Sequence, residues 1–577
     1  MKEILFKKDK KDYKLPPNLA DYEKTAESYN FKKTEKELAW FPERKLNAAY
    51  CAVDKHLTTP RKNKVALYFE DESGDKREYS FWQLAAESNK IANALKKHGA
   101  KRGDRVFIFL PRIPELYFSF LAILKIGAVA GTMFQAFGPE GIFDRLSNSD
   151  AKILITTREL SERIDKIKKR LPNLKKVFIV DDAPKKSYEI DYTKEVNKSS
   201  DKFNIAKMDK DDYAFMLYTS GTTGKPKGVV HSHFAILHEH MTAKWVLDIH
   251  DEDILWCTAD PGWVTGIGYT ILGVWSSGAS EIIFNGRFDE AKWYQILQNY
   301  KVSIWYTAPT AIRMLMKAGD DLVKKFDLSN LRHLASVGEP LNPGPIKWGL
   351  KVFKLPFHDN WWQTETGGIC IANYPTIDIK LGSMGKPVPG VEAAIIDNNG
   401  KKLPPNTEGD LALKPGWPSM MKTIWRRPHK YDSYFRNGYY ISGDRAYVDK
   451  DGYFWFIGRA DDVIKTAGER VGPFEVESSL VDSGKVIEAG VIGKPDPERG
   501  EIIKAFCVLK PGVKPSNNLE IELSQYVKTH LAGHAYPKEI EFVKTLPKTR
   551  SGKIMRRVLK AKELGLPIGD TSTLEEY

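Results

Sequence analysis

The chain has 577 residues, of which 42% are hydrophobic and 28% are charged, and this composition excludes a disordered or collagen-like protein. Its length exceeds what one hydrophobic core usually supports, so we expect at least two domains. The net charge of +13 leaves two classes open, proteins that bind nucleic acid or anionic membranes and proteins that handle anionic small molecules.

The basic residues are spread along the chain and interleaved with Asp and Glu, which favours anionic small molecules over nucleic acid. Four cysteines lie far apart without the spacing of a zinc or redox site, and this predicts a reducing, cytoplasmic location. Residues 1–14 are charged throughout, and the longest apolar stretch, 116–134, contains Lys125 and two glycines. We therefore expect a buried helix followed by a strand there, and no membrane partner.

Helical and strand-like segments alternate along the chain. Residues 81–98 place Leu84, Ile91 and Leu95 on one helical face and end before Gly99, a residue that often terminates helices. A further helix is expected from Leu116, and buried strands are expected at 106–110, 153–156, 177–180 and 215–219. The alternation predicts an α/β fold in which helices cover the sheets.

One domain boundary is expected near Asp461. A turn and strand at 451–458 lead into 459–462, after which about a hundred residues remain, a typical domain size. We expect a large multi-sheet domain at 1–460, with 1–60 packed on it as an extension, and a small, mobile α+β domain at 461–577. Asp461 would be the hinge.

The segment 218–228 reads Tyr-Thr-Ser-Gly-Thr-Thr-Gly-Lys-Pro-Lys-Gly and follows a strand-like run. Glycines let backbone N–H groups approach a polyphosphate, hydroxyls add donors and lysines neutralise charge. It is not a Walker A loop, because the glycine spacing is too short and Pro226 blocks the helix that such a loop opens. A phosphate-binding loop is favoured over a surface turn, and its candidate ligand residues are Thr219, Ser220, Gly221, Thr222, Thr223, Gly224 and Lys225.

Together with four later segments, this loop resembles the signature of the acyl-adenylate-forming superfamily, which includes AMP-forming acyl-CoA synthetases, luciferases and peptide-synthetase adenylation domains. Within it the likeness is closest to the acetyl-CoA synthetases. The resemblance implies that ATP and acetate form acetyl-AMP and pyrophosphate, and that the acetyl group then passes to coenzyme A. The later segments are Trp-Trp-Gln-Thr-Glu-Thr at 361–366, Tyr-Ile-Ser-Gly-Asp at 440–444, Gly-Arg-Ala-Asp at 458–461 and Pro-Lys-Thr-Arg-Ser-Gly-Lys at 547–553.

The resemblance also implies roles for individual residues in nucleotide binding. Glu365 would coordinate Mg²⁺, a hard cation that prefers carboxylate and phosphate oxygens. Asp444 and Arg459 would hold the ribose, and Arg470 the adenylate phosphate or the nearby CoA. The adenine would be framed by Gly338, Glu339, Pro340 and Trp361, with Asn360, Trp362, Gln363 and Thr364 completing the nucleotide site.

Lys553 is the expected catalytic residue of the first half-reaction. Attack of a carboxylate on the α-phosphorus brings two anions together, and an ammonium that bridges their oxygens stabilises that charge. The second half-reaction needs the CoA thiol in the same space, so we expect the small domain to rotate about Asp461 between the steps. Residues expected to contact CoA are Ala467, where related enzymes often have serine, Gly468 and Lys528.

Acetate is expected as the acid because Trp362 occupies a position where medium-chain relatives typically have glycine. An indole there would close the acyl tunnel, while propionate stays a secondary substrate, since one methylene gives limited discrimination. The remaining pocket wall is expected from Trp263, Val264, Thr265 and Val337.

Several alternatives stay open. A medium-chain or aryl acyl-CoA synthetase would share every motif except Trp362. A peptide-synthetase domain is usually followed by a carrier domain, whereas this chain ends at Tyr577, and a luciferase-like oxygenase needs a large pocket. A basic nucleic-acid-binding protein would bind in a salt-dependent way and release no pyrophosphate. The segment 547–557 also resembles the site at which acetyl-CoA synthetases are acetylated on the catalytic lysine, which implies a lysine acetyltransferase and a deacetylase acting on Lys553.

Overall fold

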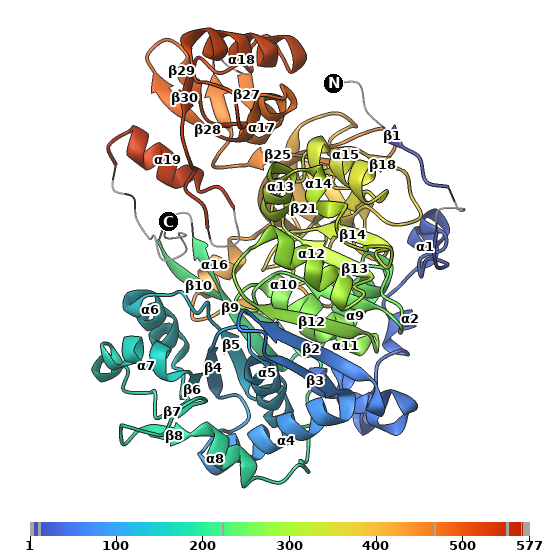
Figure 1. Cartoon of the computed structure of the whole chain (residues 1–577), viewed down its shortest axis with the longest axis vertical. Coiled ribbons are helices and arrows are strands. Elements are labelled where there is room, and N and C mark those ends of the chain that lie inside the picture. The colour runs from blue at the N-terminus through green and yellow to red at the C-terminus, as the bar shows by residue number, and fades with distance from the viewer. Residues whose placement is uncertain are drawn as a thin grey trace.

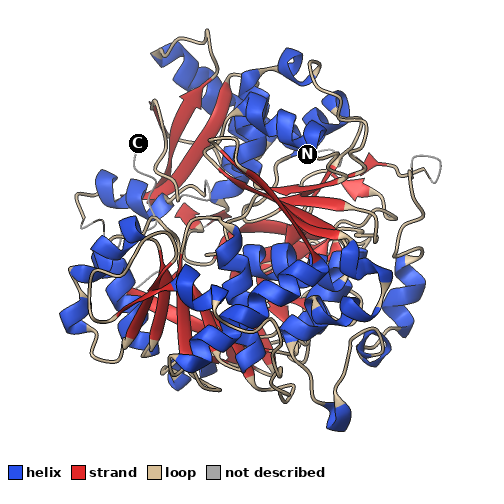
Figure 2. Cartoon of the chain, turned by 60° about the horizontal axis from the view of Figure 1, so that its bottom comes forward, coloured by secondary structure: helices blue, strands red, loops and turns tan. Residues whose placement is uncertain are grey.

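The computed structural model describes residues 5–9, 13–221, 224–466, 469–549, 553–566 and 568. A smaller C-terminal lobe lies at one end of a large N-terminal lobe (Figure 1). The boundary near Asp461 stays a prediction. Helices cover the outer faces of the sheets in the large lobe, so the predicted α/β class is confirmed (Figure 2).

One sheet of the large lobe has eight strands, and its strands β4 to β8 run parallel. Strands of this kind are covered by helices on both faces, which explains why they read as continuous apolar runs. In spatial order they are β22 (Thr423–Ile424), β10 (Gly224–Ser232), β9 (Tyr213–Gly221), β5 (Val129–Thr132), β4 (Arg105–Phe109), β6 (Ile153–Thr156), β7 (Lys176–Ile179) and β8 (Glu189–Asp191).

A second sheet has seven strands, which pair in parallel except for the terminal pair β2 and β3. Its parallel strands all end at one edge, and that edge carries two of the expected motifs. In spatial order the strands are β15 (Phe357–His358), β14 (His333–Ser336), β13 (Ile304–Thr307), β11 (Ile254–Cys257), β12 (Ser280–Asn285), β2 (Val65–Asp71) and β3 (Lys76–Ser80).

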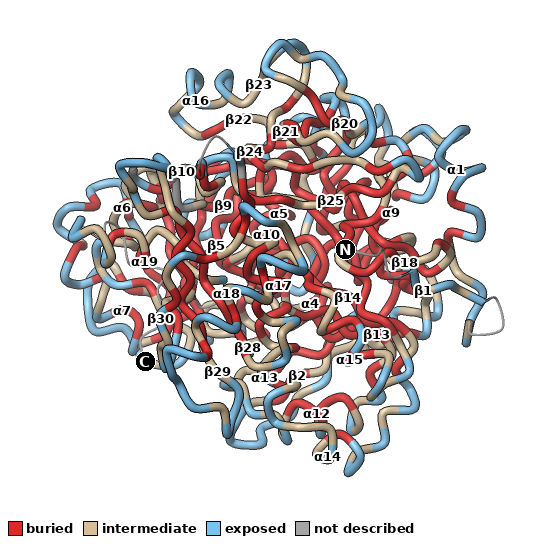
Figure 3. Tube along the Cα trace, turned by 90° about the horizontal axis from the view of Figure 1, so that it is seen from above, coloured by how far each residue is buried: buried red, intermediate tan, exposed pale blue. Residues whose placement is uncertain are grey.

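Helices pack on these sheets, and their ends follow from local sequence. Ser80 and Gln83 form a capping box that starts α4, and Gly127, in the left-handed conformation with φ +78°, ends α5. The buried residues gather between the helices and along the strands, as the colouring of Figure 3 shows. The main helices are α4 (Phe81–Lys97), α5 (Pro114–Ile126), α6 (Pro139–Ser149), α7 (Arg158–Asp165), α9 (Ala235–Trp245), α12 (Glu290–Asn299), α13 (Pro309–Ala318) and α15 (Pro343–Val352).

An antiparallel sheet next to the C-terminal lobe completes the large lobe. The C-terminal lobe has its own sheet and a hydrophobic core made of residues between Ile464 and Ile540. The antiparallel sheet of the large lobe consists of β20 (Ala393–Ile396), β21 (Gly409–Leu413), β24 (Tyr439–Val448), β23 (Phe435–Arg436) and β25 (Phe454–Arg459). The C-terminal lobe consists of β26 (Ile464–Thr466), β27 (Glu469–Val471), α17 (Pro473–Asp482), β28 (Val486–Asp496), β29 (Gly500–Leu509), α18 (Asn517–His530), β30 (Glu539–Phe542) and α19 (Arg556–Glu563).

Several of the first sixty residues contact the large lobe. Strand β1 (Leu5–Phe6) pairs with β18 (Ile379–Lys380), and Leu19 and Leu46 are buried in the main core. None of the described helices combines the length and the apolar character needed to cross a membrane. The hinge at Asp461 stays a prediction.

Candidate active site

The segments around Gly338 and Asn360, both expected to bind the nucleotide, lie side by side at the carboxyl edge of the seven-stranded sheet. Val337 and Gly338 directly follow β14, and Asn360 follows the neighbouring strand β15. Gly338 has φ +94°, and, apart from its own chain neighbours, no described residue has a heavy atom within 4 Å of where a β-carbon would stand. Ligands of open α/β sheets bind outside the carboxyl ends of strands, so this open space is suited to a ligand.

A hydrogen-bond network joins this edge to strand β24. Trp361 Nε1 donates to Asp444 Oδ2 at 2.9 Å, and Gln363 Nε2 donates to the same oxygen at 3.1 Å. Asp444 Oδ1 makes no hydrogen bond within the described residues, and Arg459 Nε lies 3.3 Å from it. Burial raises the pKa of Asp444, while Arg459 opposes that shift. Asp444 therefore presents a buried oxygen with free acceptor capacity beside a guanidinium.

Glu365 is held by two residues that are not among the expected ligands. Lys227 Nζ lies 2.8 Å from Glu365 Oε1, and the Tyr434 hydroxyl donates to the same oxygen at 3.0 Å. Burial alone would raise the pKa of Glu365, but the Lys227 ammonium and the Tyr434 hydroxyl hold it below its usual range. Lys227 stands in the glycine-rich segment just after the expected ligands, whereas no pattern marked Tyr434.

The glycine-rich segment spans the end of β9 and the start of β10, which pair antiparallel, so no helix begins at Pro226, as expected. Thr219 pairs with Lys227 across the hairpin, and Thr219 Oγ1 is buried without a hydrogen-bond partner among the described residues. Lys225 is exposed, 3.7 Å from Asp144. Among the other expected ligands, Thr222 and Thr223 lie outside the described residues, as do the side chains of Ser220, Gly221 and Gly224.

Lys553 stands in the C-terminal lobe, where its backbone makes two hydrogen bonds with Thr549. Its backbone N–H donates to Thr549 Oγ1 at 3.1 Å, and its carbonyl accepts from the Thr549 N–H at 2.8 Å. The side chain is open to water, yet enough protein surrounds it that desolvation, followed by Arg459, lowers its pKa. Asp444 acts in the opposite direction. The ammonium thus lies within electrostatic range of Asp444, across the boundary between the lobes.

Among the residues expected to contact CoA, only Lys528 has a side chain that the structure describes. Ala467 and Gly468 lie outside the described residues, and so does the side chain of Arg470 in β27. Lys528 stands in the last turn of α18, with its ammonium 5.2 Å from the centre of the Tyr536 ring. These assignments stay predictions.

Three of the residues expected around the acyl group belong to the main core or pack against it. Val264 and Val337 are buried in one hydrophobic cluster, and Trp362 packs against the same cluster. The Trp362 ring packs against the Tyr269 ring edge to face, with ring centroids 5.2 Å apart. Thr265 is also buried. Trp263 differs from the other four, because its ring packs against Phe134, with centroids 4.8 Å apart.

Asp359, which the motifs did not single out, is a buried acid at the start of the nucleotide motif. Its carboxylate accepts from the backbone N–H of Asn360 at 3.0 Å and, more weakly, from that of Leu341 at 3.4 Å. Desolvation by burial raises the pKa of Asp359 to about 8. The group is therefore protonated in the folded protein at neutral pH, unlike an aspartate in the unfolded chain.

This shift predicts a pH-dependent stability. The folded state holds the Asp359 proton up to about pH 8, whereas the unfolded state releases it near pH 4. The free energy of unfolding therefore falls as pH rises through that window, by at most about 1.4 kcal/mol per pH unit. Asp359→Asn should flatten this fall, measured by urea unfolding across the window. The exposed Asp432→Asn variant serves as control, and an Asp359→Asn slope equal to wild type would contradict the assignment.

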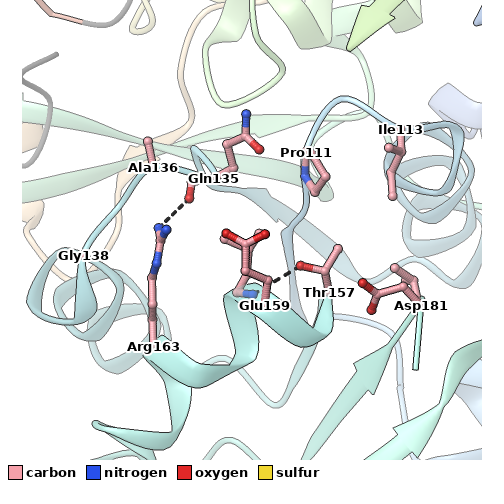
Figure 4. Close-up of a pocket in the computed structure, with 11 residues that line it drawn as sticks. Pro111, Ile113, Gln135, Ala136, Gly138, Thr157, Glu159, Arg163 and Asp181 are labelled. Carbon is pink, nitrogen blue, oxygen red and sulfur yellow. Dashed lines mark hydrogen bonds between the residues drawn. The ribbon is translucent and has the colours of Figure 1, made fainter. Parts of the chain in front are cut away.

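A separate cavity of about 800 Å³ lies at the carboxyl ends of β4 to β7 in the eight-stranded sheet. Figure 4 shows Arg163 reaching the backbone of Gln135 on one side, with the Glu159 and Asp181 carboxylates toward the other. Arg163 donates to the Gln135 carbonyl at 2.6 Å. None of the residues expected to bind nucleotide, acid or CoA lines this cavity.

Comparison with protein families matches residues 54–425 to the AMP-binding enzyme family and 475–553 to the AMP-binding enzyme C-terminal domain. An acetyl-coenzyme A synthetase from Bacillus subtilis is 56% identical over 97% of this chain and 98% of its own length. One from Methanothrix thermoacetophila is 44% identical over 93% of this chain and 86% of its own length.

Solved structures resemble the chain over most of its length. The anthranilate CoA ligase AuaEII, in complex with anthranoyl-AMP, has a TM-score of 0.83 and 30% identity, covering 90% of this chain and 98% of its own. An acyl-CoA synthetase from Brucella canis has a TM-score of 0.74 and 34% identity, covering 94% of this chain and 99% of its own.

Proposed function

The chain belongs to the AMP-binding enzymes, and from this premise we propose that it is an acetate–CoA ligase. It joins acetate to ATP, giving acetyl-AMP and pyrophosphate, and then transfers the acetyl group to coenzyme A, giving acetyl-CoA and AMP. The observation that supports this proposal is the buried network of Asp444, Trp361 and Gln363 in the large lobe, with the Lys553 ammonium of the other lobe within electrostatic range of Asp444. Relatives named acetyl-coenzyme A synthetase support acetate as the acid.

In the first half-reaction an acetate oxygen attacks the α-phosphorus of ATP, and the bond to pyrophosphate breaks. The Lys553 ammonium lies between the carboxylate and phosphate oxygens and stabilises the charge that gathers there. The ribose hydroxyls donate to Asp444 Oδ1, which has free acceptor capacity. The adenine lies in the open space beside Gly338, while Thr219 Oγ1 donates to a phosphate oxygen.

Glu365 is the proposed ligand of Mg²⁺. The donor set fits, because Mg²⁺ is usually bound by one or two carboxylates together with substrate phosphates, and Glu365 is a buried, ionised carboxylate. When bound, the cation would neutralise phosphate charge and orient the pyrophosphate leaving group. Lys227 and Tyr434 keep the Glu365 carboxylate oriented and ionised.

In the second half-reaction the CoA sulfur attacks the acetyl carbonyl and AMP leaves. Lys553 must withdraw for the thiol to approach, so the C-terminal lobe turns about Asp461, and Ala467, Gly468, Arg470 and Lys528 come to serve CoA. The scattered cysteines favour the cytoplasm as location. Lys553 is the proposed target of a lysine acetyltransferase and a deacetylase, since acetylation removes its charge.

A panel of carboxylic acids with ATP, Mg²⁺ and CoA tests the proposal. Acetate should give the fastest pyrophosphate release and acetyl-CoA as product, propionate should follow, and longer or aromatic acids should react poorly. Preference for hexanoate or benzoate would favour the medium-chain or aryl reading instead. Salt-sensitive DNA binding without pyrophosphate release would overturn the enzyme assignment.

A further inference from the structure

A series of ion-paired side chains connects the large lobe with the loop that contains Lys553. It starts at Glu339, beside the open space at Gly338, and ends at Lys548. Lys548 belongs to the segment 547–555, which we call the Lys553 loop and of which residues 550–552 lie outside the described residues. Figure 1 shows helix α13, which supplies the central member, at the end of the large lobe nearest the C-terminal lobe.

The first link lies within the large lobe. Arg313 donates to Glu339 Oε2 at 2.8 Å, and the Thr310 hydroxyl donates to Glu339 Oε1 at 2.7 Å. Arg313 and Glu339 side chains are only 11% and 9% exposed. The Glu339 carboxylate is thus bound to two residues of α13, which fixes the position of the residue next to Gly338.

The second link crosses between the lobes. Arg313 Nε lies 3.6 Å from Glu488 Oε1, and Glu488 is only 10% exposed at the start of β28. Apart from the contact between Arg459 and Asp461 at the linker itself, no other ion pair joins the lobes within the part of the chain that the structure describes. The contact is therefore specific to this arrangement of the lobes.

The third link reaches the Lys553 loop. Glu488 Oε2 lies 2.6 Å from Lys548 Nζ. Lys548 forms a backbone bridge with Ile554, the residue after Lys553, so its position sets the base of the loop. At the other end of the loop, Arg556 donates to Glu477 at 2.6 Å and 2.9 Å, within the C-terminal lobe.

We propose that Arg313 and Glu488 are positioning residues for the first half-reaction. Their ion pair connects Glu339, next to the proposed adenine site, with Lys548 in the Lys553 loop, and so holds Lys553 beside the nucleotide. The pair must break when the lobe turns, because only Glu488 travels with the C-terminal lobe. It therefore favours adenylate formation and plays no part in thioester formation. This inference rests on the proposed function.

The test measures the two half-reactions separately in Glu488→Gln, which removes the charge and keeps the shape. Acetate-dependent ATP–pyrophosphate exchange should fall about tenfold, the loss expected for a modest buried charge contact. Acetyl-CoA formation from saturating, supplied acetyl-AMP and CoA should stay at the wild-type rate. Glu522→Gln serves as matched control, because Glu522 pairs with Lys485 on the exposed surface of the same lobe and should change neither rate.

A double-mutant cycle with Arg313→Gln separates coupling from general damage. If the pair acts as one unit, the double variant should lose no more exchange activity than the worse single variant. Equal loss of both half-reactions in Glu488→Gln, no loss in either, or additive losses in the cycle would overturn the inference. If Glu488→Gln does not fold, Arg313→Lys is measured in its place, with the same expectation and the same contrary result. Absence of acetate-dependent exchange in the wild type would instead overturn the proposed function.

Discussion

Lys553→Ala is expected to lower acetate-dependent ATP–pyrophosphate exchange by about 10²- to 10³-fold, the effect of removing one preorganised donor from a site where negative charge develops. Formation of acetyl-CoA from supplied acetyl-AMP should be spared, because the leaving group is then already in place and the lobe has turned. The reason is local, since this ammonium is the cation that the C-terminal lobe places within range of Asp444.

The contrast between the half-reactions separates a catalytic role from a structural one. Lys562→Ala in the neighbouring helix α19 removes an exposed lysine from the same lobe and should leave both rates unchanged. Equal loss of both half-reactions in Lys553→Ala, with an unchanged melting temperature, would contradict the assignment of Lys553 to the first step alone.

Local pattern was enough to predict much of the sheet architecture. Strand β6 (Ile153–Thr156) has the predicted bounds, and β4, β7 and α4 differ from prediction by about one residue at their ends. These elements are short apolar runs or one-faced helices, whose burial follows from side-chain periodicity alone. The segment after Pro226 could also be predicted as non-helical, because proline lacks the N–H that a helix interior uses.

The contacts that support the candidate site could not be predicted in this way. Tyr434 and Glu365 lie far apart in the sequence, and nothing in the residues around Tyr434 indicates a carboxylate partner. Arg313 and Glu488 read separately as ordinary charged residues of a helix and a strand. Asp359 resembles a turn residue until its burial is known. Such pairings depend on how sheets and lobes pack, which periodicity does not encode.

Trp362→Gly is expected to change the preferred acid from acetate to acids of four to six carbons. The indole packs against the main core and meets the Tyr269 ring edge to face, so its removal leaves space at the acyl end of the site. Each methylene that the enlarged pocket can accommodate should lower the activation free energy that sets kcat/KM by about 1–3 kcal/mol, which raises kcat/KM roughly 10- to 200-fold. The ratio of butyrate to acetate kcat/KM should therefore rise by at least about tenfold.

Two further variants show whether volume is the cause. Trp362→Phe should give an intermediate ratio, because a smaller ring fills part of the space, whereas Trp82→Ala, at a tryptophan that is 53% exposed on α4, should leave the ratio at wild type. Loss of stability alone would lower activity toward all acids in parallel and leave the ratio constant. An unchanged ratio in folded Trp362→Gly would therefore remove Trp362 from the acyl pocket and reopen the choice between acetate and longer acids, because the other expected wall residues do not distinguish them.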